Sequence, residues 1–237
     1  KPIASGPYVD RMLIRYPANL SRFSGNVIFE WLNGNLGFDA PAAWPDMWRQ
    51  ITRNGDIWVG MSTKSLATLR RSDPDRYGLL SFANPRAAAS TAGCQQPAEE
   101  DALAYDVATQ AANLLRQRDH PLNPLHGLNV QTVIATGYSQ SALLLATYTS
   151  LIVPTLGYLP FDGYLVSSGI GGGNLNACTA APPGIFPLSH GEPVMQTQTP
   201  SETTLLLLVS QQSDDGDSLT NKYRYYDLPG TGHIDQT

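Results

Sequence analysis

The sequence predicts an α/β fold in which helices cover both faces of a mainly parallel sheet. Segments typical of buried strands alternate with segments of helical spacing, and that order is typical of such sheets. The 237 residues, 42% of them hydrophobic, are enough for one large domain with a substantial core. We therefore expect residues 1–237 to form a single domain. Because the chain opens almost directly on strand-like sequence, we interpret it as a processed form or the ordered part of a longer protein.

Strands are expected where β-branched and aromatic residues cluster between turn residues. In chain order they are 11–16, 27–32, 57–61, 133–135, 163–167, 194–199 and 223–228. Helices are expected at 44–53, where bulky residues recur at steps of three and four, and at 97–118, where acidic residues follow Pro97 at the start. Residues 203–212 fit a helix or a further strand. Residues 65–94 lack periodicity, so we expect a loop at the rim of the site.

Residues 131–150 predict a strand, a one-residue hinge and a buried helix. An apolar β-branched run leads into Gly137-Tyr138-Ser139-Gln140-Ser141, and an almost wholly apolar segment, 142–146, follows it. A strand that turns sharply into a helix at G-x-S-x-G is the nucleophile elbow of α/β hydrolases. Here Ser141 replaces the last glycine, and we expect the substitution to be tolerated because serine is also small.

A serine nucleophile needs a base, which is usually a histidine held by a carboxylate. The histidines that follow Ser139 are His190 and His233. His233 lies in a glycine-flanked turn directly after the last expected strand, where its side chain can be held over the edge of the sheet. His190 lies in an irregular proline-rich loop that precedes any plausible acid. We therefore predict His233 as the base.

The acid of such a site should lie between the serine and the histidine. Glu202 follows one expected strand, whereas Asp214, Asp215 and Asp217 follow the next apolar run. A helix and a strand fit between Glu202 and His233, but little more than a strand fits after the aspartates. We predict Glu202, with an aspartate of the cluster, Asp214 or Asp215 above all, as the alternative.

An oxyanion hole needs two backbone N–H groups aimed at the carbonyl oxygen that gains charge. The elbow places the N–H of Gln140, the residue after the nucleophile. The second donor should come from the loop after the strand 27–32, which makes Asn33 or Gly34 the candidate. An ordinary Asn-Gly turn is the alternative interpretation of that pair.

The net charge of −5 and the lack of a basic run argue against nucleic acid or an anionic membrane surface as partner. No apolar stretch approaches the roughly 18 residues that a membrane span requires. The glycine cluster at 169–173 lacks the lysine of a phosphate-binding loop. Nothing in the sequence indicates a metal or a cofactor, and it does not determine the oligomeric state.

The chain has two cysteines, Cys94 and Cys178, both in loop-like sequence. They either form one disulfide, which would indicate an oxidising compartment, or remain separate thiols. The glycosylation sequon Asn19-Leu20-Ser21 is a second, weak indication of secretion. Together these features slightly favour a secreted or periplasmic protein.

Four segments in this order resemble the "α/β hydrolase domain-containing" family of bacterial and fungal proteins. They are Phe29–Asn33, with its E-W-L-N strand, Val133–Ala142, with an A-T-G-x-S-Q-S-A elbow, Thr197–Glu202, with an acid after T-x-T, and Leu228–His233, with its G-T-x-H end. The resemblance covers nearly the whole chain. The chain departs from the family in two places. Pro200 and Ser201 precede the acid where the family is usually more compact. Such proteins also usually continue beyond the histidine, so we expect terminal segments to be missing.

The resemblance implies an α/β-hydrolase fold with a loop-built rim or small lid. It also implies that the protein is a serine hydrolase that acts on small carboxylic esters, with Ser139, Glu202 and His233 in the triad positions. An acyltransferase with the same triad and an inactive hydrolase scaffold that only binds ligands are the alternatives. Aromatic residues are candidates for lining an apolar pocket, although such residues usually pack in a core. These residues are Trp44, Trp48, Tyr138, Tyr158 and Phe161.

Overall fold

The computed structural model describes residues 4–62, 64–91, 93–169, 171–204 and 212–233. The strands of its main sheet are Met12–Arg15 (β1), Asn26–Leu32 (β2), Ile57–Ser62 (β3), Thr132–Tyr138 (β6), Gly163–Ser167 (β7), Pro193–Gln198 (β8) and Lys222–Asp227 (β9). Six of them lie within one residue of the expected bounds. β6 continues three residues further than expected, because the glycine and tyrosine of the elbow motif keep the extended conformation up to the serine.

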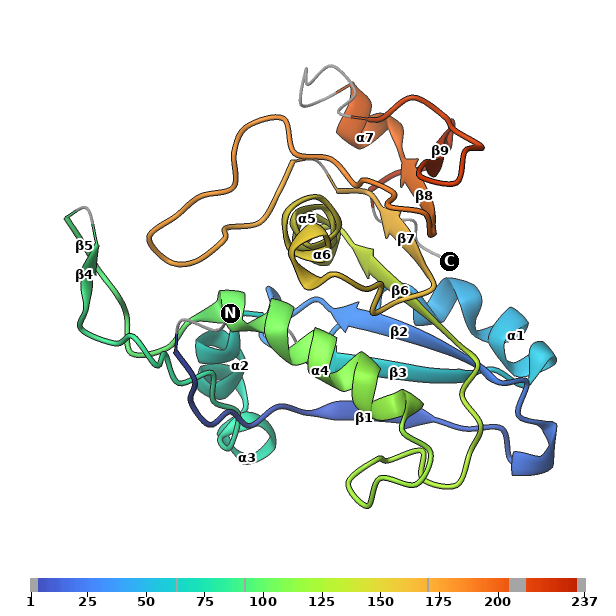
Figure 1. The fold of residues 1–237 in the computed structure, drawn as a ribbon, viewed down its shortest axis with the longest axis horizontal. Coiled ribbons are helices and arrows are strands. Elements are labelled where there is room, and N and C mark those ends of the chain that lie inside the picture. The colour runs from blue at the N-terminus through green and yellow to red at the C-terminus, as the bar shows by residue number, and fades with distance from the viewer. Residues whose placement is uncertain (1–3, 63, 92, 170, 205–211, 234–237) are drawn as a thin grey trace.

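These strands form a seven-stranded sheet in the order β1-β3-β2-β6-β7-β8-β9 (Figure 1). β1 is antiparallel to β3, and all the other neighbours are parallel. The expected α/β class with a mainly parallel sheet is therefore confirmed. No helix in the described part of the chain is both long enough and apolar enough to cross a membrane.

Helices cover both faces of the sheet, as expected (Figure 1). On one face, α1 (Trp44–Asn54) packs Ile51 against Ile28 and Trp58. On the opposite face, α4 (Ala104–Arg116) and α5 (Gln140–Thr147) bury their apolar residues against the alternate residues of the same strands. Because successive strand residues point to opposite faces, one strand supplies both cores.

Glu30 of β2 is a buried carboxylate that fixes the start of α1. Its two oxygens accept hydrogen bonds from the N–H groups of Ala43 (2.7 Å) and Trp44 (3.2 Å) and from the indole of Trp58 (2.8 Å). Burial raises the pKa of Glu30 to about 7, although these three donors act in the opposite direction. The glutamate of the E-W-L-N motif thus joins a helix to two strands.

The expectation of a patternless loop over 65–94 was wrong. This region holds α2 (Leu66–Ser72), α3 (Pro74–Tyr77) and a hairpin of two short strands, β4 (Ser90–Thr91) and β5 (Cys94–Gln95). Elements of two to seven residues are too short to show a period in the sequence. The helices are held by buried apolar side chains, among them Leu66 and Leu69.

The helix expected from Pro97 begins later, at Ala104, after a 3-10 turn at Asp101–Leu103 (η2). Residues 98–100 instead run beside residues 82–84, where Asn84 donates to the Ala98 carbonyl (2.9 Å) and Glu100 donates to the Phe82 carbonyl (3.0 Å). The side chain of Glu100 then caps the turn by accepting from Ala102 (3.1 Å). These pairings outweigh the helix-start signals in the sequence.

Four shorter helical segments complete the described elements. They are η1 (Leu20–Arg22), η3 (Tyr148–Ile152), α6 (Val153–Leu156) and α7 (Pro200–Thr203). Of these, η3 is a π-helix. The π-helix and α6 continue α5. Most of the segment 203–212, expected to be a helix or a strand, lies outside the described residues.

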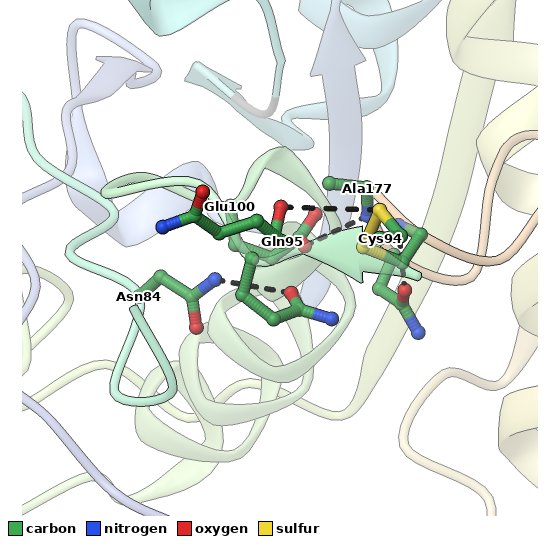
Figure 2. The surroundings of a disulfide bond; sticks show 8 residues. Asn84, Cys94, Gln95, Glu100 and Ala177 are labelled. Atoms are coloured by element: carbon green, nitrogen blue, oxygen red, sulfur yellow. Dashed lines mark hydrogen bonds between the residues drawn. A yellow bond between two sulfur atoms is a disulfide. The ribbon is translucent and has the colours of Figure 1, made fainter. Parts of the chain in front are cut away.

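Cys94 and Cys178 form a disulfide with a Cα–Cα distance of 5.7 Å (Figure 2). It joins the β4–β5 hairpin to the long loop between β7 and β8. Beside it, Glu100 accepts a hydrogen bond from the N–H of Ala177 (2.8 Å), and the hydroxyl of Tyr105 donates to the Asn174 carbonyl (3.0 Å). The covalent bond attaches the loop to the hairpin, and the two hydrogen bonds attach it to Glu100 and to the start of α4.

Removal of this disulfide should destabilise the fold. The bond closes a loop with a sequence separation of 84, and a crosslink of that span typically contributes about 2–4 kcal/mol by restricting the unfolded chain. We expect the double variant Cys94→Ser/Cys178→Ser to lose about that free energy of unfolding in urea. The parent protein in reductant should show the same loss. An unchanged urea midpoint in both samples would contradict this assignment.

Candidate active site

The site lies where the strand order reverses. From β2 the chain runs to β3 on one side and then returns to β6 on the other, so β2 and β6 are adjacent and parallel. In open α/β sheets, ligands bind at the carboxyl ends of the strands beside such a reversal. Asn33 directly follows β2 and Ser139 directly follows β6.

Ser139 stands at a sharp turn between β6 and α5. Its backbone has φ 55° and ψ −114°, a conformation that is costly for a residue with a side chain. Its N–H donates to the Ser167 carbonyl (2.9 Å), which ties the turn to the end of β7. A Cβ at Gly137 would lie 2.9 Å from the backbone of Ser141, so strand and helix approach closely only because residue 137 is glycine.

Three side chains far apart in the sequence form one hydrogen-bonded series. The Oγ of Ser139 lies 2.9 Å from Nε2 of His233. On the other side of the ring, Nδ1 lies 2.5 Å from Oε1 of Glu202. With Nδ1 protonated, the carboxylate accepts one ring proton and leaves Nε2 free to accept the proton of the serine hydroxyl.

Glu202 is also the third residue of α7 and completes its capping box. Its second oxygen accepts from the N–H (2.6 Å) and the hydroxyl (2.7 Å) of Thr199. Burial raises the pKa of Glu202, but the hydrogen bonds from His233 and Thr199 outweigh that effect, and the pKa lies below its usual value. The carboxylate is therefore held ionised beside the imidazole ring.

The backbone of His233 is held at both ends. Its N–H donates to Oγ of Ser201 (3.1 Å), and its carbonyl accepts from the hydroxyl of Tyr138. The Tyr138 and His233 rings lie 5.5 Å apart between centroids. Sequence reasoning missed both contacts. The one signal for Tyr138 is its position beside the nucleophile, and the residues before the acid gave no signal for Ser201.

The alternative base lies elsewhere in the structure. His190 places Nε2 at 2.7 Å from the Thr149 carbonyl and donates its backbone N–H to Glu192 (3.0 Å). It therefore connects the long loop to the π-helix and does not contact Ser139.

The alternative acids also contact other groups. Asp215 accepts from the N–H of Tyr225 (3.0 Å), and Asp217 pairs with Arg224 (2.5 Å). The Asp214 carbonyl accepts from Asn221 (3.4 Å). All three aspartates support the turn before β9.

The candidate oxyanion donors differ in their availability. Gln140 is the first residue of α5, and its N–H has no acceptor within the described residues. The N–H of Asn33 donates to the Ala40 carbonyl (3.1 Å), so this candidate donor is already engaged. The N–H of Gly34 has no described acceptor. A Cβ at Gly34 would lie 2.5 Å from the Lys64 carbonyl, so this position requires glycine.

Comparison with known proteins agrees with this arrangement of strands. A family model described as "Alpha/beta hydrolase domain" matches residues 1–237. The chain belongs to this alpha/beta hydrolase family. A search of curated proteins found no match.

The hydrolase fold is also found in solved structures of distant sequence. Esterase 2 of the planctomycete Thermogutta terrifontis with bound propionate has a TM-score of 0.50 at 14% identity, covering 93% of this chain and 78% of that chain. The butyrate-bound form has a TM-score of 0.51 at 14% identity, covering 94% and 79%. These similarities establish the fold.

A cavity of about 610 Å³ opens over the serine of this hydrolase. Its described lining residues are Asn35, Lys64, Ser139, Gln140, Leu143, Ser168, Gly169, Ser201, Glu202 and His233. Most are polar, and the five aromatic residues proposed from the sequence are absent from them. Phe161 is buried in the core, and Tyr138 lines a neighbouring cavity.

The described residues contain no group of three or more His, Cys, Asp or Glu side chains arranged to hold a metal ion.

The hydrogen bonds to Glu202 should make stability depend on pH. A carboxyl whose pKa is lower in the folded than in the unfolded state stabilises the fold above its unfolded pKa, about 4.3, and this contribution disappears as the pH falls through the folded value. We therefore expect Glu202→Gln to be less stable than the parent at neutral pH, and the difference to shrink in acid. Urea unfolding at several pH values measures it. A difference that stays constant with pH would contradict this linkage.

Proposed function

We propose that this alpha/beta hydrolase is a serine esterase that cleaves carboxylic esters through an acyl-enzyme. The observation that carries the proposal is the series from Ser139 through His233 to Glu202, with distances of 2.9 and 2.5 Å. The expected reaction consumes one ester and one water and yields one carboxylic acid and one alcohol.

In the first half of the reaction, Nε2 of His233 takes the proton of the Ser139 hydroxyl as Oγ attacks the ester carbonyl. The ionised Glu202 keeps the imidazole in the right tautomer and stabilises the positive charge that the ring acquires. Collapse of the tetrahedral intermediate breaks the bond to the alcohol oxygen, and His233 returns the proton to this leaving group. The acyl group then remains on Ser139.

Negative charge on the former carbonyl oxygen needs donors that are already in place. We assign this role to the N–H of Gln140 at the start of α5 and to the N–H of Gly34 after β2. The positive end of the α5 dipole adds to the same effect. Removal of one such donor in comparable sites typically costs about 3 kcal/mol of barrier.

In the second half, water replaces the alcohol. His233 accepts a proton from that water, the hydroxide equivalent attacks the acyl carbon, and the bond to Ser139 breaks as His233 returns the proton to Oγ. The carboxylic acid leaves and the free serine is restored.

The structural neighbours support an ester of a carboxylic acid. Propionate and butyrate, both short carboxylates, are the ligands named in the two structures of Thermogutta terrifontis esterase 2. Such acids are the products that a carboxylic ester hydrolase releases from its acyl-enzyme.

Loss of the nucleophile should abolish the activity. We expect Ser139→Ala to lower the turnover of 4-nitrophenyl butyrate by about 10⁴-fold or more, because the triad members act as a unit. Its melting temperature should stay close to that of the parent, since alanine keeps the Cβ and the substitution removes only the hydroxyl group. A fluorophosphonate probe should label the parent at residue 139, as read by peptide mass mapping.

Ser218→Ala serves as the matched control, because this serine is exposed in the turn before β9 and does not line the cavity. It should retain the activity and labelling of the parent. Esterase activity in Ser139→Ala near the parent level would refute the proposed mechanism.

A further inference from the structure

The cavity over Ser139 contains a cation that the mechanism does not use. Lys64 lines this cavity and is the only lysine or arginine among its described lining residues. Lys64 is only partly exposed to solvent. Lysine is usually well exposed, or else paired with a carboxylate.

Lys64 has no such pair in the described residues. Among the residues that the structure describes, no carboxylate lies within ion-pair distance of its ammonium group and no hydrogen-bond acceptor contacts it. The acid in the same cavity is not available either, because Glu202 uses one oxygen for His233 and the other for Thr199. A ligand anion in the cavity would therefore meet a positive charge that no described carboxylate pairs with.

A second hydrogen-bond donor lies beside the lysine. Asn35 also lines the cavity, and its side-chain oxygen accepts from the hydroxyl of Ser65 (3.3 Å). That contact directs the oxygen toward Ser65 and leaves the amide NH₂ without an acceptor among the described residues. The side chains of Lys64 and Asn35 therefore offer hydrogen-bond donors to a ligand in the cavity, whereas the one acceptor between them, the Asn35 oxygen, is already used by Ser65.

The order of the strands places this donor pair on a defined side of Ser139. Lys64 follows β3 and Asn35 follows β2, whereas Glu202 and His233 follow β8 and β9. Because β6 lies between these two groups of strands, Lys64 and His233 approach the serine from opposite sides. His233 protonates the leaving alcohol, so the alcohol leaves on its side, and the part of the cavity next to Lys64 is left for the oxyanion and the acyl part.

We propose that the acyl part of the substrate carries a second carboxyl group, whose carboxylate pairs with Lys64 and accepts a hydrogen bond from Asn35. This inference rests on the proposed esterase function and specifies its substrate class, a half-ester of a dicarboxylic acid. Hydrolysis of such a half-ester consumes one water and releases the dicarboxylate and the alcohol.

A carboxylate fits this place better than a phosphate. Phosphate sites usually combine arginines or several backbone donors around a doubly charged group, whereas one ammonium and one amide match a single negative charge. The chain has a net charge of −5, which repels anions at long range. A local cation is thus needed for an anionic substrate to bind here.

The test compares charged and neutral esters of one acid. We would measure methanol release from the monomethyl and dimethyl esters of succinic, glutaric and adipic acid and take the ratio of kcat/KM for each pair. Lys64→Met, which keeps a long unbranched side chain without the charge, should lower that ratio about ten-fold or more for the favoured acid, since a charge-assisted hydrogen bond contributes that much. Lys64→Arg should restore most of it.

Lys222→Met is the matched control, because it removes the same charge from an exposed residue on β9 outside the cavity. Its ratio should equal that of the parent. In the parent, added salt should lower the ratio, whereas in Lys64→Met salt should have little effect, because screening acts on the ion pair.

The outcomes separate this inference from the proposed function. If the parent hydrolyses the dimethyl esters in a Ser139-dependent way, but Lys64→Met has the parent ratio for all three acids, the carboxylate site is refuted and the esterase stands. If the folded parent hydrolyses none of the six esters and no 4-nitrophenyl ester, both are refuted. A ten-fold lower ratio confined to Lys64→Met supports the site.

Discussion

The close approach of β6 and α5 at Ser139 is the constraint on which the site depends. A left-handed backbone at the serine lets the strand turn into the helix within one residue, and Gly137 leaves room for the helix backbone. At this turn Oγ contacts His233, and both Ser139 and Gln140, the first residue of α5, line the same cavity. The buried core around α5 provides the packing that keeps such a costly conformation in place.

Structural and chemical roles overlap in several residues around this turn. The carboxylate of Glu202 caps a short helix and contacts the imidazole of His233, so the geometry of the cap determines where this carboxylate lies relative to the ring. Tyr138 belongs to the elbow and also holds the backbone of His233. Glu30 joins α1 to β2, the strand that leads into the loop of Gly34. The site is therefore supported by the elements that stabilise the fold.

Much of this could be predicted from the sequence, for reasons that differ between elements. The strands were predictable because buried parallel strands are dense in β-branched residues, and the elbow because its glycine and serine meet a strict steric demand. The start of α4 was not predictable, since long-range pairing of residues 98–100 with 82–84 replaces the first helical turn. For the same reason the sequence could not show that the Asn33 N–H is engaged by Ala40.

The packing of Gly34 against Lys64 has a consequence for protein engineering. The nearest atom to a Cβ placed at Gly34 is the main-chain carbonyl oxygen of Lys64, at 2.5 Å, and every residue at position 64 has such a carbonyl. The proposed acyl pocket can accordingly be varied at the side chain of residue 64 while this main-chain contact is kept. A saturation library at this single codon would explore acyl preference while the catalytic geometry stays unchanged.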